Sequence, residues 1–379
     1  MNHAKNSVRF KSWWWRSLSS VALAGLCLLG GAMTGEKPNS APVSESDEGK
    51  IQMLLALVWE GRDLAPHNLA ALEEFRREYP DVSVIHLVNP AYFTKPKADG
   101  QQVAAALKAH VRPQDQVGLL LGPWRTLTQA AGVIFRPAPT FWSPVAPPGD
   151  CVIDCGGDVP LTIYPEADVD KLLAQSIKLL ESHGFARPVG FAVQGWMASA
   201  NIQESAVRAG LRFDFSAVAP DLLVSRVRHY PLYSWARAMW PDITPHSQPY
   251  TIQTGAGPVV EVPMSLAAMD YVTRKEVDTL FQEYVQLWQQ EPAKDLIFPL
   301  VFSQETAMVT VPFLRNALKG IFATAASRQV PLAAMRLPDE LPSGWDETHN
   351  RPAPKAPVPL APSAAPATTP GPVTVPVAH

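Results

Sequence analysis

Short apolar runs alternate with segments of helical periodicity from residue 51 to residue 337, and this alternation limits the folds that the chain can adopt. The apolar runs predict strands at 51–58, 82–88, 117–121, 188–194, 211–215, 295–302 and 331–336. Apolar residues at helical spacing predict helices at 67–79, 101–111, 168–183, 201–209, 274–290 and 311–327. Strands that alternate with helices form a mainly parallel sheet. About seven such units favour an α/β fold of the distorted (β/α) barrel type, with function on the loops at the carboxyl ends of the strands.

The N-terminal segment has the order of charge and hydrophobicity that is typical of a secretory signal. Residues 1–16 carry four basic side chains and no acidic one, and residues 17–33 carry no charge. This order predicts that residues 1–33 are a signal peptide or a membrane anchor. The domain that follows is then periplasmic, either released or anchored to the inner membrane. Leu26 before Cys27 argues against a lipoprotein, because a lipidated cysteine follows a small residue.

Two further segments differ in composition from the central domain at 51–340. Residues 34–50 are polar and contain Pro, Ser and acidic residues, which indicates a linker. Residues 341–379 are rich in Pro and Ala and nearly free of charge, so they cannot bury a core. We therefore expect a disordered tail that samples polyproline II and serves as a spacer or an interaction segment.

Charge and cysteine content exclude two classes of site. The 32 basic and 35 acidic side chains nearly balance, so the chain lacks the excess of positive charge that nucleic-acid binding requires. Cys151 and Cys155 are candidates for a disulfide in an oxidising compartment, or they stay free. No further soft ligands lie near them in the sequence, so the pattern predicts no zinc site there.

Four segments at predicted strand ends carry a family resemblance. They are ALVWEG at 56–61, DQVGLLLGPW at 115–124, RPVGFAVQGWMASANIQESAVRAGLRFDFSAVAP at 187–220 and LIFPLVFSQE at 296–305. In order and spacing they resemble the motifs of the polysaccharide deacetylase family, the metal-dependent carbohydrate esterases on a distorted (β/α) barrel. Gly210, Asp214 and Ser216 match the turn pattern of the third motif. The resemblance covers most of residues 51–337.

The resemblance implies a specific chemistry. In this family a divalent metal such as zinc, held by one carboxylate and two histidines, activates a water molecule. A second carboxylate takes the proton of that water, and another histidine protonates the leaving amine.

The chain departs from the family pattern at the positions that carry this chemistry. Trp59 occupies the position of the catalytic base, and Glu60 occupies the position of the metal-binding carboxylate. Leu120 occupies the position of the first metal-binding histidine, and Trp124 or Gly122 occupies the position of the second. Ala192 replaces the arginine and Ser303 replaces the closing histidine. The resemblance therefore implies a divergent member that lacks the catalytic residues and binds no metal cofactor.

Four acidic residues are weak candidates for a different catalytic site. Glu60 and Glu305 follow predicted strands, and Asp154 and Asp158 lie in the segment DCGGD. Glu60 serves as a ligand or base, or else it forms a salt bridge with Arg62. Asp154 and Asp158 line the mouth of the barrel, or else they are turn residues.

Polar and aromatic residues at the same strand ends are candidates for glycan binding. Trp59, Trp124 and Trp196 each follow a predicted strand, where an indole ring can stack on a sugar or pack into the core. Gln304 follows the last long strand, as a polar pocket group or a helix cap. A barrel should bring Trp59 and the residues at positions 120, 192 and 303 to one opening.

Three functions follow as hypotheses. The first is an envelope protein that is deacetylase-like, catalytically degenerate, and binds a polysaccharide or a polysaccharide-processing protein. The second is an active carbohydrate esterase with an unconventional acidic site. The third is an interaction protein of a polysaccharide export complex that docks through its Pro-rich tail.

Overall fold

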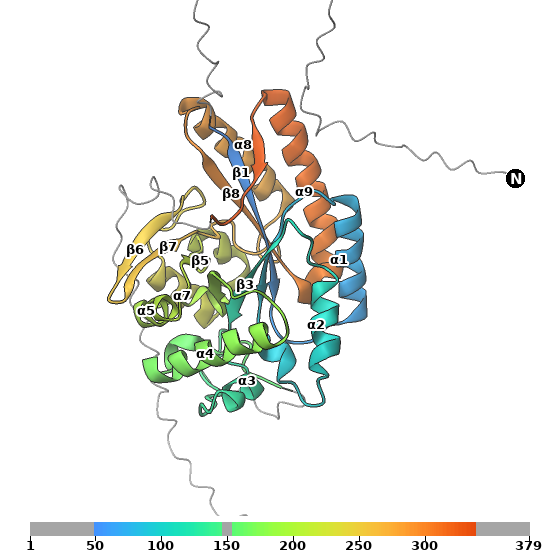
Figure 1. Cartoon of the computed structure of the whole chain (residues 1–379). Helices are drawn as coiled ribbons and strands as arrows, with labels where there is room; N and C mark the ends of the chain where they lie inside the picture. The colour runs from blue at the N-terminus through green and yellow to red at the C-terminus, as the bar shows by residue number, and fades with distance from the viewer. Residues whose placement is uncertain (1–48, 146–153, 339–379) are drawn as a thin grey trace, which may run out of the picture. The chain divides into compact units, whose positions relative to one another are not determined.

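The computed structural model describes residues 49–145 and 154–338, which form a sheet covered by helices (Figure 1). The strands are β1 (Ile51–Trp59), β2 (Ile85–Val88), β3 (Gln116–Leu121), β4 (Gly190–Val193), β5 (Phe213–Asp214), β6 (Tyr250–Thr254), β7 (Gly257–Glu261), β8 (Leu296–Ser303) and β9 (Leu332–Ala334). Their order is β6-β7-β5-β4-β3-β2-β1-β8, and β9 also pairs with β1. Every pair is parallel except β6 with β7. The predicted α/β class with a mainly parallel sheet is confirmed.

The strands are connected by helices that cover the outer face of the sheet. The α-helices are α1 (Pro66–Glu78), α2 (Gly100–Lys108), α3 (Arg125–Ala130), α4 (Glu166–Ser182), α5 (Ala200–Arg208), α6 (Val224–Val227), α7 (Pro231–Met239), α8 (Arg274–Gln290) and α9 (Ala307–Arg328). Short 3₁₀ helices are η1 (Pro90–Phe93), η2 (Leu161–Ile163), η3 (Gln194–Trp196), η4 (Pro220–Leu223) and η5 (Gln304–Thr306). Helices α1 and α9 pack side by side (Figure 1). None of the helices within the described ranges combines the length and the hydrophobicity that crossing a membrane requires.

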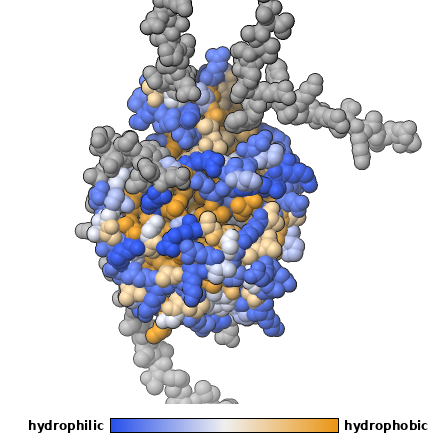
Figure 2. Space-filling model, viewed as in Figure 1, coloured by the Kyte–Doolittle hydropathy of each residue, from blue (hydrophilic) through white to orange (hydrophobic). Residues whose placement is uncertain are grey.

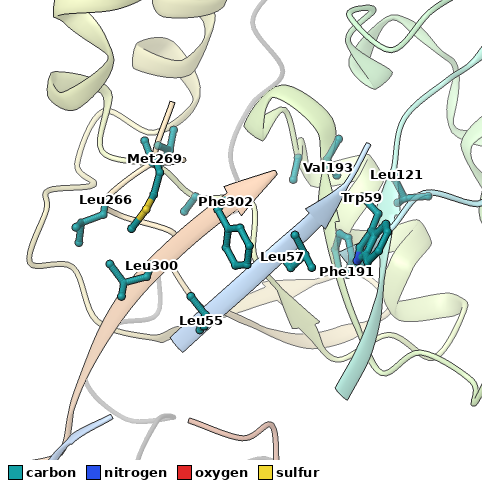
Figure 3. Packing of buried hydrophobic residues seen from close by; sticks show 14 of the residues in the cluster. Leu55, Leu57, Trp59, Leu121, Phe191, Val193, Leu266, Met269, Leu300 and Phe302 are labelled. Atoms are coloured by element: carbon teal, nitrogen blue, oxygen red, sulfur yellow. The ribbon is translucent and has the colours of Figure 1, made fainter. Parts of the chain in front are cut away.

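Side chains that alternate along the strands form two separate apolar clusters. Leu55, Leu57 and Trp59 of β1 belong to the large cluster beneath the helices, where Figure 3 shows them close to side chains of β4 and β8. Leu54 and Ala56 belong to a smaller cluster with inward residues of β2, β3, β4, β5, β7 and β8. Since successive side chains of a strand point to opposite faces, the smaller cluster fills the concave side of a curled sheet.

The segment after β7 connects the two sides of the curled sheet. Ala268 forms a parallel bridge with Val301 of β8, and the Met269 N–H donates to the Val301 carbonyl at 2.8 Å. At the amino ends of the strands, Met335 and Leu337 contribute to the inner cluster. The barrel is thus filled from below, which leaves its carboxyl edge as the open end.

The surface is typical of a globular protein. In Figure 2 the face of the described part is a mosaic of hydrophilic residues with smaller hydrophobic areas between them. Apolar atoms form a large share of any folded surface, so this mosaic by itself marks no binding site.

Candidate functional site

A cavity of about 810 Å³ opens at the carboxyl ends of the strands. Its floor consists of inward apolar residues such as Val58, Leu120, Phe215 and Val301, and its upper wall is aromatic and polar. Cavities of this size hold small organic ligands in many proteins. The position agrees with the expectation that function lies at this edge of a parallel barrel.

Three of the four strand-end residues predicted to share one opening line this cavity, and the fourth does not. Leu120, Ala192 and Ser303 are all part of the lining. Trp59 is fully buried on the opposite face of β1, and its Nε1 donates to His86 Nδ1 at 3.1 Å (Figure 3). The prediction that Trp59 borders the opening is wrong, because strand alternation turns Glu60 into the cavity and Trp59 away from it.

Glu60, Ser303 and Glu305 form one hydrogen-bond network at the ends of β1 and β8. The Ser303 hydroxyl donates to Glu60 Oε1 at 2.7 Å, and its oxygen lies 3.2 Å from Glu305 Oε2. Glu305 also accepts hydrogen bonds from the backbone N–H groups of Glu60 and Arg62, each at 3.2 Å, and from the Tyr92 hydroxyl at 2.5 Å. Glu60 lines the cavity, whereas Glu305 holds Glu60 from behind and is not part of the lining.

Burial raises the pKa of both carboxyl groups. Desolvation is the largest cause for each, and it raises the pKa of Glu305 to about 7. The neighbouring Glu60 charge acts in the same direction on Glu305, while the Ser303 hydroxyl opposes the rise in the pKa of Glu60. Two carboxyl groups this close favour a shared proton near neutral pH.

Asp154 and Asp158 both line the cavity, but their surroundings differ. Asp154 forms a buried ion pair with Lys95 at 2.7 Å and accepts from the Thr126 hydroxyl at 2.6 Å, so it anchors its loop. Asp158 has a raised pKa, chiefly because of burial. Cys155, between them, lines the cavity and is disulfide-bonded.

Cys151, the predicted partner of Cys155, lies outside the described residues.

Gly122 occupies a position where the family resemblance places a histidine, and the structure has no room for a side chain there. A Cβ on Gly122 would lie 2.0 Å from Gln194 Oε1 and 2.9 Å from Asn89 Nδ2. The space above Gly122 is therefore filled by the amides that follow β4 and β2. Replacing this glycine would require both neighbouring amides to move.

Trp196 is held at the cavity by an unusual backbone. Gly195 and Trp196 both have left-handed φ angles, of 70° and 63°. The Trp196 carbonyl accepts a hydrogen bond from Trp240 Nε1 at 2.7 Å, and its ring packs edge-on against Tyr271 at 5.3 Å between centroids. A bulky residue in this conformation costs about 1–3 kcal/mol and is typical of functional positions. The predicted site residue Trp196 does line the cavity.

Of the other two predicted glycan-binding residues, Trp124 lines the cavity and Gln304 lies below it. Trp124 lines the cavity, its Nε1 donates to the Glu60 carbonyl at 2.8 Å, and Lys95 Nζ lies 3.5 Å from its ring centroid. Gln304 is fully buried and accepts from the Tyr92 hydroxyl at 3.0 Å, so it does not line the cavity. Gln304 therefore supports the network from below and is not a pocket group.

Sequence reasoning missed Asp270 and Tyr271, which line the cavity between β7 and β8. No strand pattern precedes them, and the Ala268–Val301 bridge brings them to the opening. The aromatic wall also includes Phe141 and Trp142. Trp142 is 42% exposed and packs edge-on against Tyr230.

The residues of the cavity do not fit the metal site of the deacetylase family. No histidine of the described residues lines the cavity, and His86 and His110 pack behind Trp59 on the outer face. Within residues 49–145 and 154–338, no three His, Cys, Asp or Glu side chains gather as a ligand set. Zinc sites use such sets of nitrogen, sulfur and carboxylate donors.

Comparisons with known proteins give low similarity throughout. No protein-family model and no curated protein sequence matches the chain. Matched solved structures include a probable polysaccharide deacetylase of Pseudomonas aeruginosa, at 12% identity and TM-score 0.45, covering 76% of this chain and 89% of that one.

Two further matched structures differ from each other in activity. A family 4 carbohydrate esterase of Streptomyces lividans matches at 10% identity and TM-score 0.36, covering 76% and 93% of the two chains. An α-amylase of Thermotoga maritima matches at 10% identity and TM-score 0.40, covering 81% and 77%. At these values the likeness assigns no activity to this chain.

Proposed function

We propose that this protein binds a glycan in the cavity at the carboxyl edge of its sheet and does not carry out metal-dependent deacetylation. The observation that carries the proposal is the aromatic wall of the cavity, in which Trp196 is held by a strained backbone. Trp196, Tyr271, Trp124 and Trp142 line the same cavity as the carboxyl groups. Sugars combine apolar ring faces with hydroxyl donors, which aromatic and carboxylate groups complement.

The proposal extends to the surroundings of the protein. The N-terminal charge pattern supports a periplasmic location, with the inner membrane as a place of attachment. A polysaccharide-processing protein is the partner class that fits a degenerate deacetylase-like domain. The Pro-rich segment at 341–379 serves as a spacer or docking segment in this proposal.

Removing the Trp196 ring is expected to weaken oligosaccharide binding about tenfold or more, which is the loss of roughly 1.4 kcal/mol. Isothermal titration calorimetry with a panel of β-1,4- and β-1,6-linked tetrasaccharides would compare Trp196→Ala with the wild type. Leu287→Ala is the matched control, because Leu287 is 38% exposed on α8 and does not line the cavity. Equal affinities of the wild type and Trp196→Ala, or no binding of any oligosaccharide, would contradict the proposal.

Metal-dependent deacetylation is expected to stay at background. Leu120, Gly122 and Ser303 cannot replace two histidine ligands and a histidine acid, and loss of the proton donor alone costs about 10²–10⁴ in rate. The measurement is acetate release from acetylated oligosaccharides with added zinc, cobalt or nickel, beside an active deacetylase. Turnover that a chelator and Glu60→Gln both abolish would support an unconventional esterase instead.

A further inference from the structure

The cavity carries more negative than positive charge. Four carboxyl groups line it, on Glu60, Asp154, Asp158 and Asp270. Asp154 is neutralised by its ion pair with Lys95. Within the described residues Arg62 is the one basic residue of the lining, and its charge acts on Asp158 as well as on Glu60.

Glu60, Asp270 and Tyr271 all line the cavity. The charges of both carboxyl groups act on the Tyr271 hydroxyl, and the charge of Asp270 acts on Glu60, so the three groups are neighbours. Neither Glu60 nor Asp270 forms an ion pair with a side chain of the described residues. The cavity thus contains two carboxyl groups without an ion-pair partner among the described residues, and Arg62 is the one basic residue of the described lining that acts on Glu60.

The amide of Gln194 adds an independent sign of a donor-bearing ligand. Gln194 lines the cavity, and its Oε1 is buried without a hydrogen-bond partner among the described residues. This oxygen lies over Gly122 near Asn89 Nδ2, which also lacks a partner among the described residues. A buried acceptor without a donor costs about 1–3 kcal/mol, which a donor from a ligand would offset.

We propose that the cavity selects a glycan with a free amine, whose ammonium group lies between Glu60 and Asp270. This inference rests on the proposed glycan-binding function and names the class of sugar. An ammonium group offers three donors and no acceptor, which suits a cavity that presents carboxylates and an unpaired amide oxygen. Trp196 and Tyr271, which pack edge-on against each other, line the same cavity, and a cation is attracted to aromatic rings.

An uncharged sugar is a poorer partner for these groups. A glycan that fills the cavity displaces water from Glu60 and Asp270, and removing water from a carboxylate is unfavourable unless a cation replaces it. Hydroxyl and acetamido groups donate hydrogen bonds but bring no charge. The amine of a hexosamine therefore distinguishes the favoured glycan from its acetylated form.

The test compares glucosamine tetramers with their fully N-acetylated counterparts, in β-1,4 and β-1,6 linkage, by calorimetry at pH 6.5 and low salt. The full chain should bind a free-amine tetramer at least tenfold more tightly than the acetylated one. Glu60→Gln and Asp270→Asn should each bring this ratio toward one, because each should weaken binding of the free-amine tetramer more than binding of the acetylated one. Asp221→Asn, outside the cavity, is the matched control, and tetralysine tests whether charge without a sugar ring suffices.

The outcomes separate this inference from the function on which it rests. Equal or tighter binding of the acetylated tetramer, weakened by Trp196→Ala, would overturn the amine selectivity and leave glycan binding in place. Tetralysine binding as tightly as the glucosamine tetramer would overturn it as well, because the cavity would then act as a general cation site. Absence of binding for every tetramer would overturn both proposals.

Discussion

Replacing Asp115 by alanine is expected to lower the free energy of unfolding by about 3–5 kcal/mol, because it leaves a buried arginine without its counter-charge. Arg76 Nη2 lies 2.8 Å from Asp115 Oδ2, and the two side chains are 2% and 0% exposed. Asp115 also accepts from the backbone N–H groups of Val84 at 2.9 Å and Arg112 at 2.7 Å. The carboxylate therefore connects α1 to the start of β3 and to the segment before β2.

The same carboxylate positions His86. His86 Nε2 lies 3.3 Å from Asp115 Oδ2, and Nδ1 accepts from Trp59 Nε1, so the neutral ring donates through Nε2. Burial lowers the pKa of His86, which agrees with a neutral ring. Losing Asp115 thus removes partners from two buried side chains at once.

The measurement is urea unfolding at pH 7.5, with the midpoint and the slope fitted together. Glu181→Ala is the matched control, because it breaks an exposed ion pair in which Glu181 is 42% and Arg187 is 55% exposed. Loss of this pair should lower the free energy of unfolding by less than about 1 kcal/mol. A loss for Asp115→Ala no larger than that of Glu181→Ala would show that the buried pair contributes little.

The sequence predicts the parallel part of the sheet well, because each of its strands is a continuous apolar run. Strands β1, β2, β3, β4 and β8 all overlap their predicted ranges. Burial on both faces of a parallel strand produces such runs. Helix α9 begins at Ala307, before the predicted start at 311, since Pro312 is accommodated inside the helix.

Residues 216–273 yielded no predicted strand or helix. The antiparallel pair β6 and β7 contains Gln253, Thr254 and Pro258 near its turn, so the apolar pattern is interrupted. Gly255 and Ala256 form the two-residue connection between the paired residues Thr254 and Gly257. Helix α6 has four residues, which is too short for a clear periodicity. Helix α7 does bury residues at helical spacing, Leu232, Trp235, Ala236 and Met239, and was missed.

The site could be predicted as far as it depends on strand ends. Leu120, Ala192 and Ser303 were predicted at the opening because each ends a predicted strand, and all three line the cavity. To predict which of two adjacent residues lines the cavity, one must also know which face of the strand each side chain occupies. Trp59 was predicted at the opening without this information, and that prediction was wrong. Groups brought together by loops, such as Asp270, have no sequence signal.

The pairing of Asp214 with Glu261 shows the same limit. The two residues are 47 positions apart, lie opposite each other in the β5–β7 register and are both fully buried. Asp214 accepts from Gln203 Nε2 at 2.9 Å and from the Ser216 hydroxyl at 2.5 Å, and Glu261 Oε1 accepts from the Ala217 N–H at 2.7 Å. Glu261 Oε2 has no hydrogen-bond donor among the described residues, so the pair is stable only while it holds a proton.

This shared proton makes stability depend on pH, and Glu261→Gln is expected to remove most of that dependence. Burial raises the pKa of Asp214 to about 6 and the pKa of Glu261 well above its ordinary value. The folded state then binds more protons than the unfolded state above about pH 4, so the stability of the wild type falls as pH rises toward the folded pKa values.

In Glu261→Gln the amide Nε2 donates to the Asp214 carboxylate, which no longer needs a proton. The free energy of unfolding should decrease between pH 5 and pH 8 in both proteins. The decrease should be roughly 2–3 kcal/mol smaller in the variant than in the wild type. Urea unfolding at several pH values measures the difference, with Asp81→Asn on an exposed turn as the control. Parallel pH profiles for Glu261→Gln and the wild type would show that the pair does not share a proton, and the register of β5 with β7 would then depend on backbone pairing alone.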